Sequence, residues 1–222
     1  MAAGDEAPAA LSELAELYWY PLYAFARFRG RSEGDAQDLV QELFALLLEK
    51  GVLRAADPER GRFRTFLLTV FKRMMATAHE KDQALKRGGG RTRLSLDFEQ
   101  GEERFRQEPP DELTPERRYE RAWALTLLDK VLQDVGAEYG REGKSLLFAE
   151  LRPFLVAGSL PPTQAEVARR LALTPGALRV ALHRLRTRYR DRLRREIGQT
   201  VADPGDVNDE IRQLMAALSP SS

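Results

Sequence analysis

The sequence predicts an all-α protein with two small helical domains joined by a flexible acidic linker, the second domain containing a helix-turn-helix. Apolar residues recur at helical spacing along most of the chain, and few segments alternate with the period of a strand. Two basic blocks, residues 61–93 and 163–196, each carry a net charge of +7. The predicted boundaries are 1–90 for the first domain, 91–114 for the linker, 115–200 for the second domain and 201–222 for an amphipathic tail helix.

The composition excludes several classes of protein. None of the 222 residues is cysteine, so disulfides and thiolate metal sites are ruled out. The start of the chain lacks the pattern of a signal peptide, and no apolar run approaches the roughly 20 residues that cross a bilayer. We therefore expect a cytoplasmic protein without a membrane partner. The basic blocks are typical of polyanion contacts, although Arg-rich solvated helices would give the same charge pattern.

Helical spacing predicts three helices in the first domain. The first covers residues 11–29, where Pro21 either kinks the helix or begins a second one. The next covers residues 34–50, with Ser32 as its N-cap, and the third covers residues 63–85. The core face of the third helix is predicted to consist of Phe63, Phe66, Val70 and Met74. This leaves the basic edge of the same helix for nucleic acid.

The helix over residues 34–50 has an acidic face opposite its leucines. That face carries Asp35, Asp38, Glu42 and Glu49. Such a helix suits docking onto a basic partner, and a merely solvated face is the alternative. Residues 91–114 contain Pro109 and Pro110, many charges and no sustained apolar period, which predicts a flexible linker.

The sharpest pattern lies between residues 163 and 196. Thr163 and Glu166 form a capping box ahead of a short helix with buried Val167, Ala168 and Leu171. Thr174 is the expected N-cap of a second helix, with Pro175 in its first position. The turn between them requires a left-handed residue, either Ala172 or Leu173, at a cost of about 1 kcal/mol.

The second of these helices has two distinct sides. Leu178, Leu182, Leu185 and Tyr189 form an apolar stripe, while Arg179, His183 and Arg186 lie opposite. A short helix, a tight turn and a second helix with an exposed basic face are typical of a helix-turn-helix that enters the major groove. An ordinary helical hairpin with a solvated arginine face is the alternative.

In order along the chain, three stretches resemble parts of bacterial sigma factors. DAQDLVQELFALLLEK resembles their second helical region, typically written D-A-E-D-L-x-Q-E-x-F. GRFRTFLLTVFKRMMATAHEK resembles the next segment, which contacts the downstream (−10) promoter element. TQAEVARRLALTPGALRVALHRLRTRYRDRL resembles the fourth-region helix-turn-helix, which contacts the upstream (−35) element. The chain is similar to the extracytoplasmic-function (ECF) class, the two-domain minimal sigma factors.

This resemblance implies a set of contact residues. Core RNA polymerase would dock on Asp35, Asp38, Gln41 and Glu42. The −10 element would be contacted and melted by Arg64, Lys72, Arg73 and Thr77. The −35 element would be contacted by Thr174, Arg179, His183, Arg184, Arg186 and Arg188. The family commonly has Trp where Phe66 stands and Asn where Arg73 stands, and the second difference points to another preferred base.

The implied partners are core RNA polymerase and promoter DNA, and an anti-sigma factor or other regulatory protein is left open. We expect no cofactor, no metal site and no enzymatic activity. An enzyme acting on nucleic acid would need clustered carboxylates or histidines, and His79 and His183 are the only histidines. The alternative function is a stand-alone helix-turn-helix repressor or activator, which would explain residues 163–196 but not the N-terminal half.

The tail carries an apolar stripe at helical spacing. It consists of Val207, Ile211, Leu214, Met215 and Leu218. We expect this helix to pack on the C-terminal domain, with a docking or autoinhibitory helix as the alternative.

Overall fold

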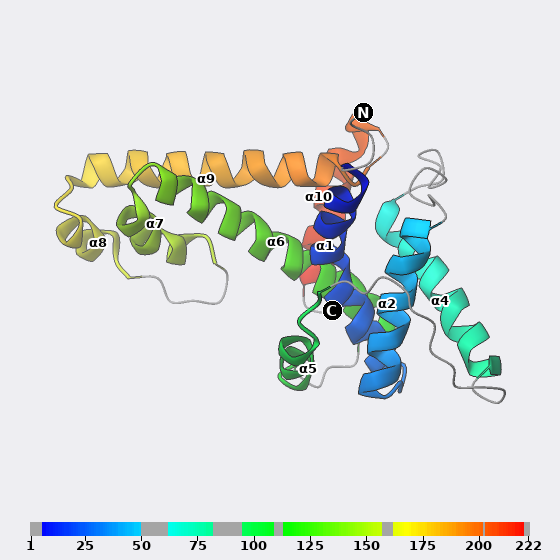
Figure 1. Cartoon of the computed structure of the whole chain (residues 1–222). Helices are drawn as coiled ribbons and strands as arrows, with labels where there is room; N and C mark the ends of the chain where they lie inside the picture. The colour runs from blue at the N-terminus through cyan, green and yellow to red at the C-terminus, as the bar shows by residue number, and fades with distance from the viewer. Residues whose placement is uncertain are drawn as a thin grey trace. The chain divides into compact units, whose positions relative to one another are not determined.

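The computed structural model describes residues 6–49, 62–81, 95–108, 113–156, 162–201 and 203–219. Its α-helices are α1 (Glu6–Phe28), α2 (Glu33–Glu49), α4 (Phe63–Lys81), α5 (Phe98–Arg106), α6 (Pro115–Arg141), α7 (Ser145–Leu151), α8 (Gln164–Arg170), α9 (Pro175–Gly198) and α10 (Val207–Leu218), with 3-10 turns η2 (Arg152–Phe154) and η3 (Pro204–Asp206) (Figure 1). These described ranges contain no strand, and the predicted all-α class is confirmed. Within them, no helix is long and apolar enough to span a membrane.

Contacts divide the chain into two compact units. Unit 1 contains Met1–Thr126 and Gly198–Ser222, and unit 2 contains Leu127–Ile197. This division differs from the predicted borders at residues 90, 114 and 200. The first turns of α6 belong to unit 1 because Tyr119 and Trp123 are almost fully buried there. The Tyr119 hydroxyl also donates a hydrogen bond to the Arg64 carbonyl, at 3.0 Å.

The start of unit 1 follows the local signals in the sequence. α1 is one continuous helix, so Pro21 does not begin a second one. It ends where the Arg31 amide donates to the Ala26 carbonyl at 3.1 Å, across the left-handed Gly30 with φ +80°. Ser32 then accepts a hydrogen bond from the Asp35 amide at 3.2 Å, as expected of an N-cap. In unit 1, α1 packs against α2, α4 and α5.

The buried face of α4 differs from the predicted one by a single position. Its most buried residues are Arg64, Leu67, Phe71 and Met75. The predicted core residues Phe63, Phe66, Val70 and Met74 are only partly buried, so that prediction is wrong. An arginine at the head of the buried stripe requires a carboxylate partner, and that partner comes from α10, distant in sequence.

Helix α5 occupies part of the segment predicted to be a flexible linker, and this prediction is wrong for residues 98–106. Asp97 caps the helix by accepting from the Gln100 amide at 3.0 Å. Gly101 lies so close to α1 that a Cβ there would be 2.7 Å from Cη2 of Trp19. Phe105 packs on the same cluster, which includes Tyr20.

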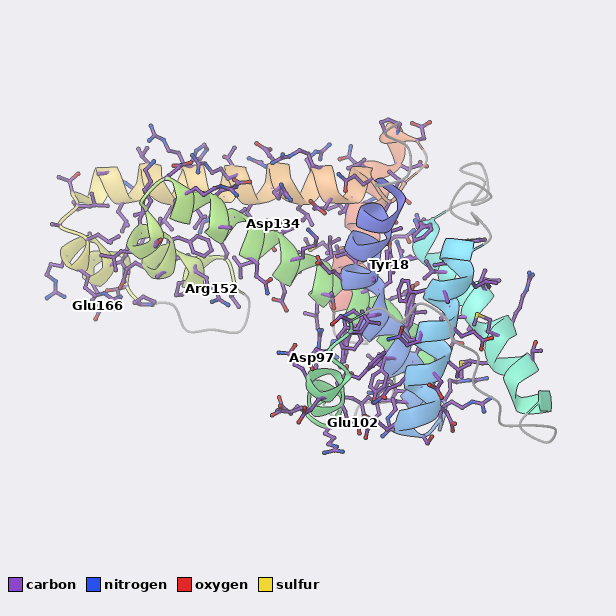
Figure 2. All side chains as sticks on the ribbon, viewed as in Figure 1. Tyr18, Asp97, Glu102, Asp134, Arg152 and Glu166 are labelled. Atoms are coloured by element: carbon purple, nitrogen blue, oxygen red, sulfur yellow. The ribbon has the colours of Figure 1, made fainter. Side chains whose placement is uncertain are left out.

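The carboxylate of Glu102, labelled in Figure 2, joins α5 to α1. It accepts from the Tyr23 hydroxyl at 2.5 Å and from Arg27 Nη2 at 3.0 Å. Burial by itself would raise the pKa of Glu102. The hydrogen bonds from Tyr23 and Arg27, with the charges of Arg27 and Arg106, outweigh burial and lower the pKa below its ordinary 4.5.

Helix α10 belongs to unit 1, so the expectation that the tail packs on the C-terminal domain is wrong. Its buried residues are Val207, Glu210 and Leu214, and Met215 remains 49% exposed. The apolar stripe predicted from the sequence is therefore rotated, because the helix turns a carboxylate toward the core. Glu210 turns inward because it pairs with the buried guanidinium of Arg64.

We expect Glu102→Gln to lower the free energy of unfolding at pH 7 by about 1.5–3 kcal/mol, because two charge-assisted contacts weaken. Since the folded-state pKa of Glu102 lies below 4.5, its contribution is full above that pH. It is lost as pH falls through the lowered folded pKa. Denaturant titrations of both proteins at neutral and acidic pH measure the difference. A gap that stays constant below pH 4.5 would contradict this account.

Candidate nucleic-acid interface

The geometry at the start of α8 in unit 2 is that of a capping box. The Thr163 hydroxyl oxygen accepts from the Glu166 amide at 3.3 Å, and the Thr163 amide donates to the Glu166 carboxylate at 2.9 Å. Hydrogen bonds from the Thr163 hydroxyl and amide lower the pKa of Glu166, which Figure 2 labels at the head of α8. The box fixes where this short helix begins.

The turn between α8 and α9 contains one left-handed residue. Ala172 has φ 51°, which selects it over Leu173 among the two predicted positions. The Leu173 amide donates to the Ala168 carbonyl at 2.9 Å and closes the end of α8. The Thr174 oxygen then accepts from the Ala177 amide at 3.2 Å, so α9 begins at Pro175. The Thr174 hydroxyl is also a hydrogen-bond donor.

Helix α9 turns an apolar side inward and a basic side outward. Leu178, Leu182 and Leu185 are nearly completely buried. The sequence-predicted contact residues on the other side are exposed, namely Arg179, His183, Arg184 and Arg186. An exposed row of guanidinium groups at the beginning of a helix can meet base edges and phosphates in a major groove.

Arg188 differs from the other predicted contact residues because Tyr139 of α6 and Glu142, directly after α6, already hold it. Its Nη1 donates to Glu142 Oε1 at 2.6 Å, and its guanidinium lies 4.9 Å from the centre of the Tyr139 ring. Hydrogen bonds from Arg188 and Lys144 lower the pKa of Glu142 to about 2. Arg192 is held in the same way by Asp134, at 2.7 Å. These arginines fasten α9 to α6 within unit 2.

The second candidate surface lies on α4 in unit 1. Arg73 and Thr77 are exposed, and the Thr77 hydroxyl donates to the Arg73 carbonyl at 3.0 Å. Lys72 is also exposed, but its Nζ lies 2.7 Å from Glu116 of α6. The hydrogen bond from Lys72 lowers the pKa of Glu116. Phosphate contact by Lys72 would therefore compete with a carboxylate.

Arg64 lies away from the other predicted contacts of α4. Its side chain is 5% exposed, it pairs with Glu210, and its guanidinium stands 4.6 Å from the centre of the Trp123 ring. In this structure Arg64 thus faces protein groups. Sequence reasoning missed Glu210, and the signal for it was a carboxylate inside the apolar stripe of the tail.

The predicted docking residues line one side of α2. Asp35, Asp38 and Glu42 are exposed, and Gln41 is partly exposed. Asp35 also accepts from the Ser32 hydroxyl at 2.6 Å. The other side of the helix is buried and includes Leu39, Val40, Leu43, Phe44 and Leu47. Glu49 lies at the end of α2, and its side chain is outside the described set.

Part of the chain matches a known protein family. Residues 14–84 match the family model described as Sigma-70 region 2, a range that includes most of α1 and all of α2 and α4. The match supports a sigma factor family, whose members are non-enzymatic transcription initiation factors. Searches of curated proteins and of solved structures found no match. Among the described residues, no group of three or more His, Cys, Asp or Glu is placed to hold a metal ion.

Arg186→Ala and Arg188→Ala should separate DNA contact from structural support. Arg186 is exposed, so its loss should weaken binding to a mixed-sequence duplex and reduce the slope of log affinity against log salt by about 0.9. Arg188→Ala should leave that slope unchanged and slightly lower the melting temperature, because its guanidinium is held by Glu142. Fluorescence titrations at several salt concentrations measure the slopes. Equal slopes for the two variants would contradict the assignment.

Proposed function

We propose that this chain is a sigma factor that binds core RNA polymerase and directs promoter recognition and transcription initiation. The observation that carries the proposal is the match of residues 14–84 to Sigma-70 region 2. The exposed carboxylates of α2 suit a basic surface of the polymerase, with Asp35, Asp38, Gln41 and Glu42 as docking residues. We further propose that it belongs to the ECF class, on its resemblance in both basic blocks.

In this proposal α4 contacts the −10 element. Arg73 and Thr77 are exposed there, and Lys72 reaches DNA after leaving Glu116. A melted strand offers phosphates to the basic groups along the helix. Arg64 joins them only if its contact with Glu210 opens.

The α8–α9 pair contacts the −35 element as a helix-turn-helix. Thr174, at the head of α9, donates its hydroxyl proton to a phosphate, and Arg179 and His183 lie within the first turns, where base edges come within reach. Arg184 and Arg186 follow on the exposed side and bind phosphates. Arg188 contributes through the packing of α9 against α6.

Two DNA-binding modules that each bind DNA weakly bind it more tightly together when both are held by one polymerase. Each module then binds intramolecularly, at an effective concentration that no free module reaches. A stand-alone repressor or activator would use α8 and α9, but this function would not explain the match of residues 14–84 to Sigma-70 region 2. Binding to core polymerase therefore discriminates between the two functions.

Asp38→Lys should weaken binding to core RNA polymerase by about tenfold or more, because it places a like charge against a basic surface. The matched control is Glu103→Lys, the same reversal on the exposed side of α5. Analytical size exclusion and fluorescence titration with core enzyme measure both. An unmodified chain that fails to bind core polymerase would contradict the proposed function. Equal affinities for the two variants would contradict the docking surface.

A further inference from the structure

Three polar side chains of α10 converge on two arginines beside the start of α4. Glu210 pairs with Arg62, whose Nε lies 2.5 Å from Oε2, and it also pairs with Arg64. Asp209 makes a second ion pair with Arg62. The amide oxygen of Gln213 accepts from Arg64 Nη2 at 2.9 Å. Arg62 and Arg64 are called the arginine pair below.

The contact between Arg64 and Glu210 is deeply buried on both sides, while Arg62 and Asp209 are partly exposed. The side chains of Arg64 and Glu210 are 5% and 2% exposed. One face of the Arg64 guanidinium is covered by Trp123, while its Nη1 and Nη2 atoms face Glu210 and Gln213. Both terminal nitrogens of Arg64, which could donate hydrogen bonds to an anion, are therefore occupied by α10.

Carboxylates and phosphates are alternative partners for a guanidinium. Both present paired oxygens that match the planar fork of arginine. The arginine pair stands at the head of the helix whose Lys72 and Arg73 the proposed function assigns to DNA. The segment from residue 197 to 222, which contains α10, carries four acidic residues and one basic residue. This segment therefore has a net negative charge, as DNA does.

Few apolar side chains of α10 are fully buried, although Ile211 and Leu218 are partly buried. Within the described residues, Val207 and Leu214 are its only buried apolar side chains. Ion pairs with Arg62 and Arg64 consequently supply much of the stability of the docked helix. A competing anion such as DNA can take the place of the carboxylates in these ion pairs. A helix docked mainly through a wide apolar face would not respond to DNA in this way.

We propose that α10 is an internal competitor of DNA, whose Asp209 and Glu210 occupy the arginine pair until DNA takes their place. The inference rests on the proposed function only in assigning α4 to DNA. Because α10 and DNA would bind the same arginines, each should weaken the binding of the other. Removing the carboxylate strengthens DNA binding, and bound DNA releases α10.

The first experiment measures affinity for a fluorescein-labelled 30-nucleotide single strand of mixed sequence, using the full chain. Glu210→Gln should bind about fivefold or more tightly than the unmodified protein, within the usual range of coupling between sites. Asp206→Asn, the same one-charge change at an exposed position before α10, should change affinity less than twofold. Adding Arg64→Gln to Glu210→Gln should remove the gain. Equal affinities for Glu210→Gln and Asp206→Asn would overturn the inference.

The second experiment leaves the arginine pair and its carboxylates unchanged, so it decides the matter if Glu210→Gln does not fold. Because the chain has no cysteine, spin labels can be placed at Thr69→Cys and Met215→Cys, both exposed positions of unit 1. Saturating DNA should lengthen the distance between the labels. An unchanged distance at saturation would show that α10 is a fixed part of unit 1 and would overturn the inference.

Binding to core polymerase, measured in parallel, keeps this inference apart from the proposed function. A chain that binds core polymerase but shows neither effect retains its proposed function and loses the competitor role of α10. A chain that shows both effects without binding polymerase supports the competitor role and contradicts the proposed function.

Discussion

The pairing of cations with carboxylates distant in sequence is the constraint on which unit 1 depends. Arg27, Arg64 and Lys72 lie within residues 14–84, the range that matches Sigma-70 region 2. Their carboxylate partners all lie beyond it, Glu102 in α5, Glu210 in α10 and Glu116 in α6. A guanidinium left without a partner in the interior is costly. The helices that follow residue 84 therefore supply the carboxylates that pair with these cations of unit 1.

The same chemistry in unit 2 distinguishes two arginines of α9 from the basic residues nearer its start. Arg188 is bound to Glu142, which directly follows α6, and Arg192 is bound to Asp134 on α6; both hold α9 in place. Arg179, His183, Arg184 and Arg186 lie closer to the start of α9 and are exposed. The later arginines secure the helix whose earlier ones meet DNA in our proposal. The fixed turn at Ala172 and the capping box set the direction in which those side chains project.

Local features of this fold could be predicted from the sequence, and features that depend on distant pairs could not. The all-helical class, the caps at Ser32 and Thr163 and the left-handed turn follow from neighbouring residues. The buried register of α4 was off by one, because Arg64 enters the core only when Glu210 and Trp123 meet it. Helix α5 was missed because the residues it buries are Gly101 and Glu102, which give no apolar period. The orientation of the tail helix could not be predicted because Glu210 turns inward only where it meets Arg64, which is distant in sequence.

In vitro transcription tests the central claim most directly. Core RNA polymerase is incubated with genomic DNA in the presence and absence of the chain, and the 5′ ends of the transcripts are mapped. A sigma factor should add discrete start sites that core enzyme alone does not use, with shared sequence upstream at two separated elements. The same pattern of transcripts with and without the chain would contradict the proposal that it directs initiation.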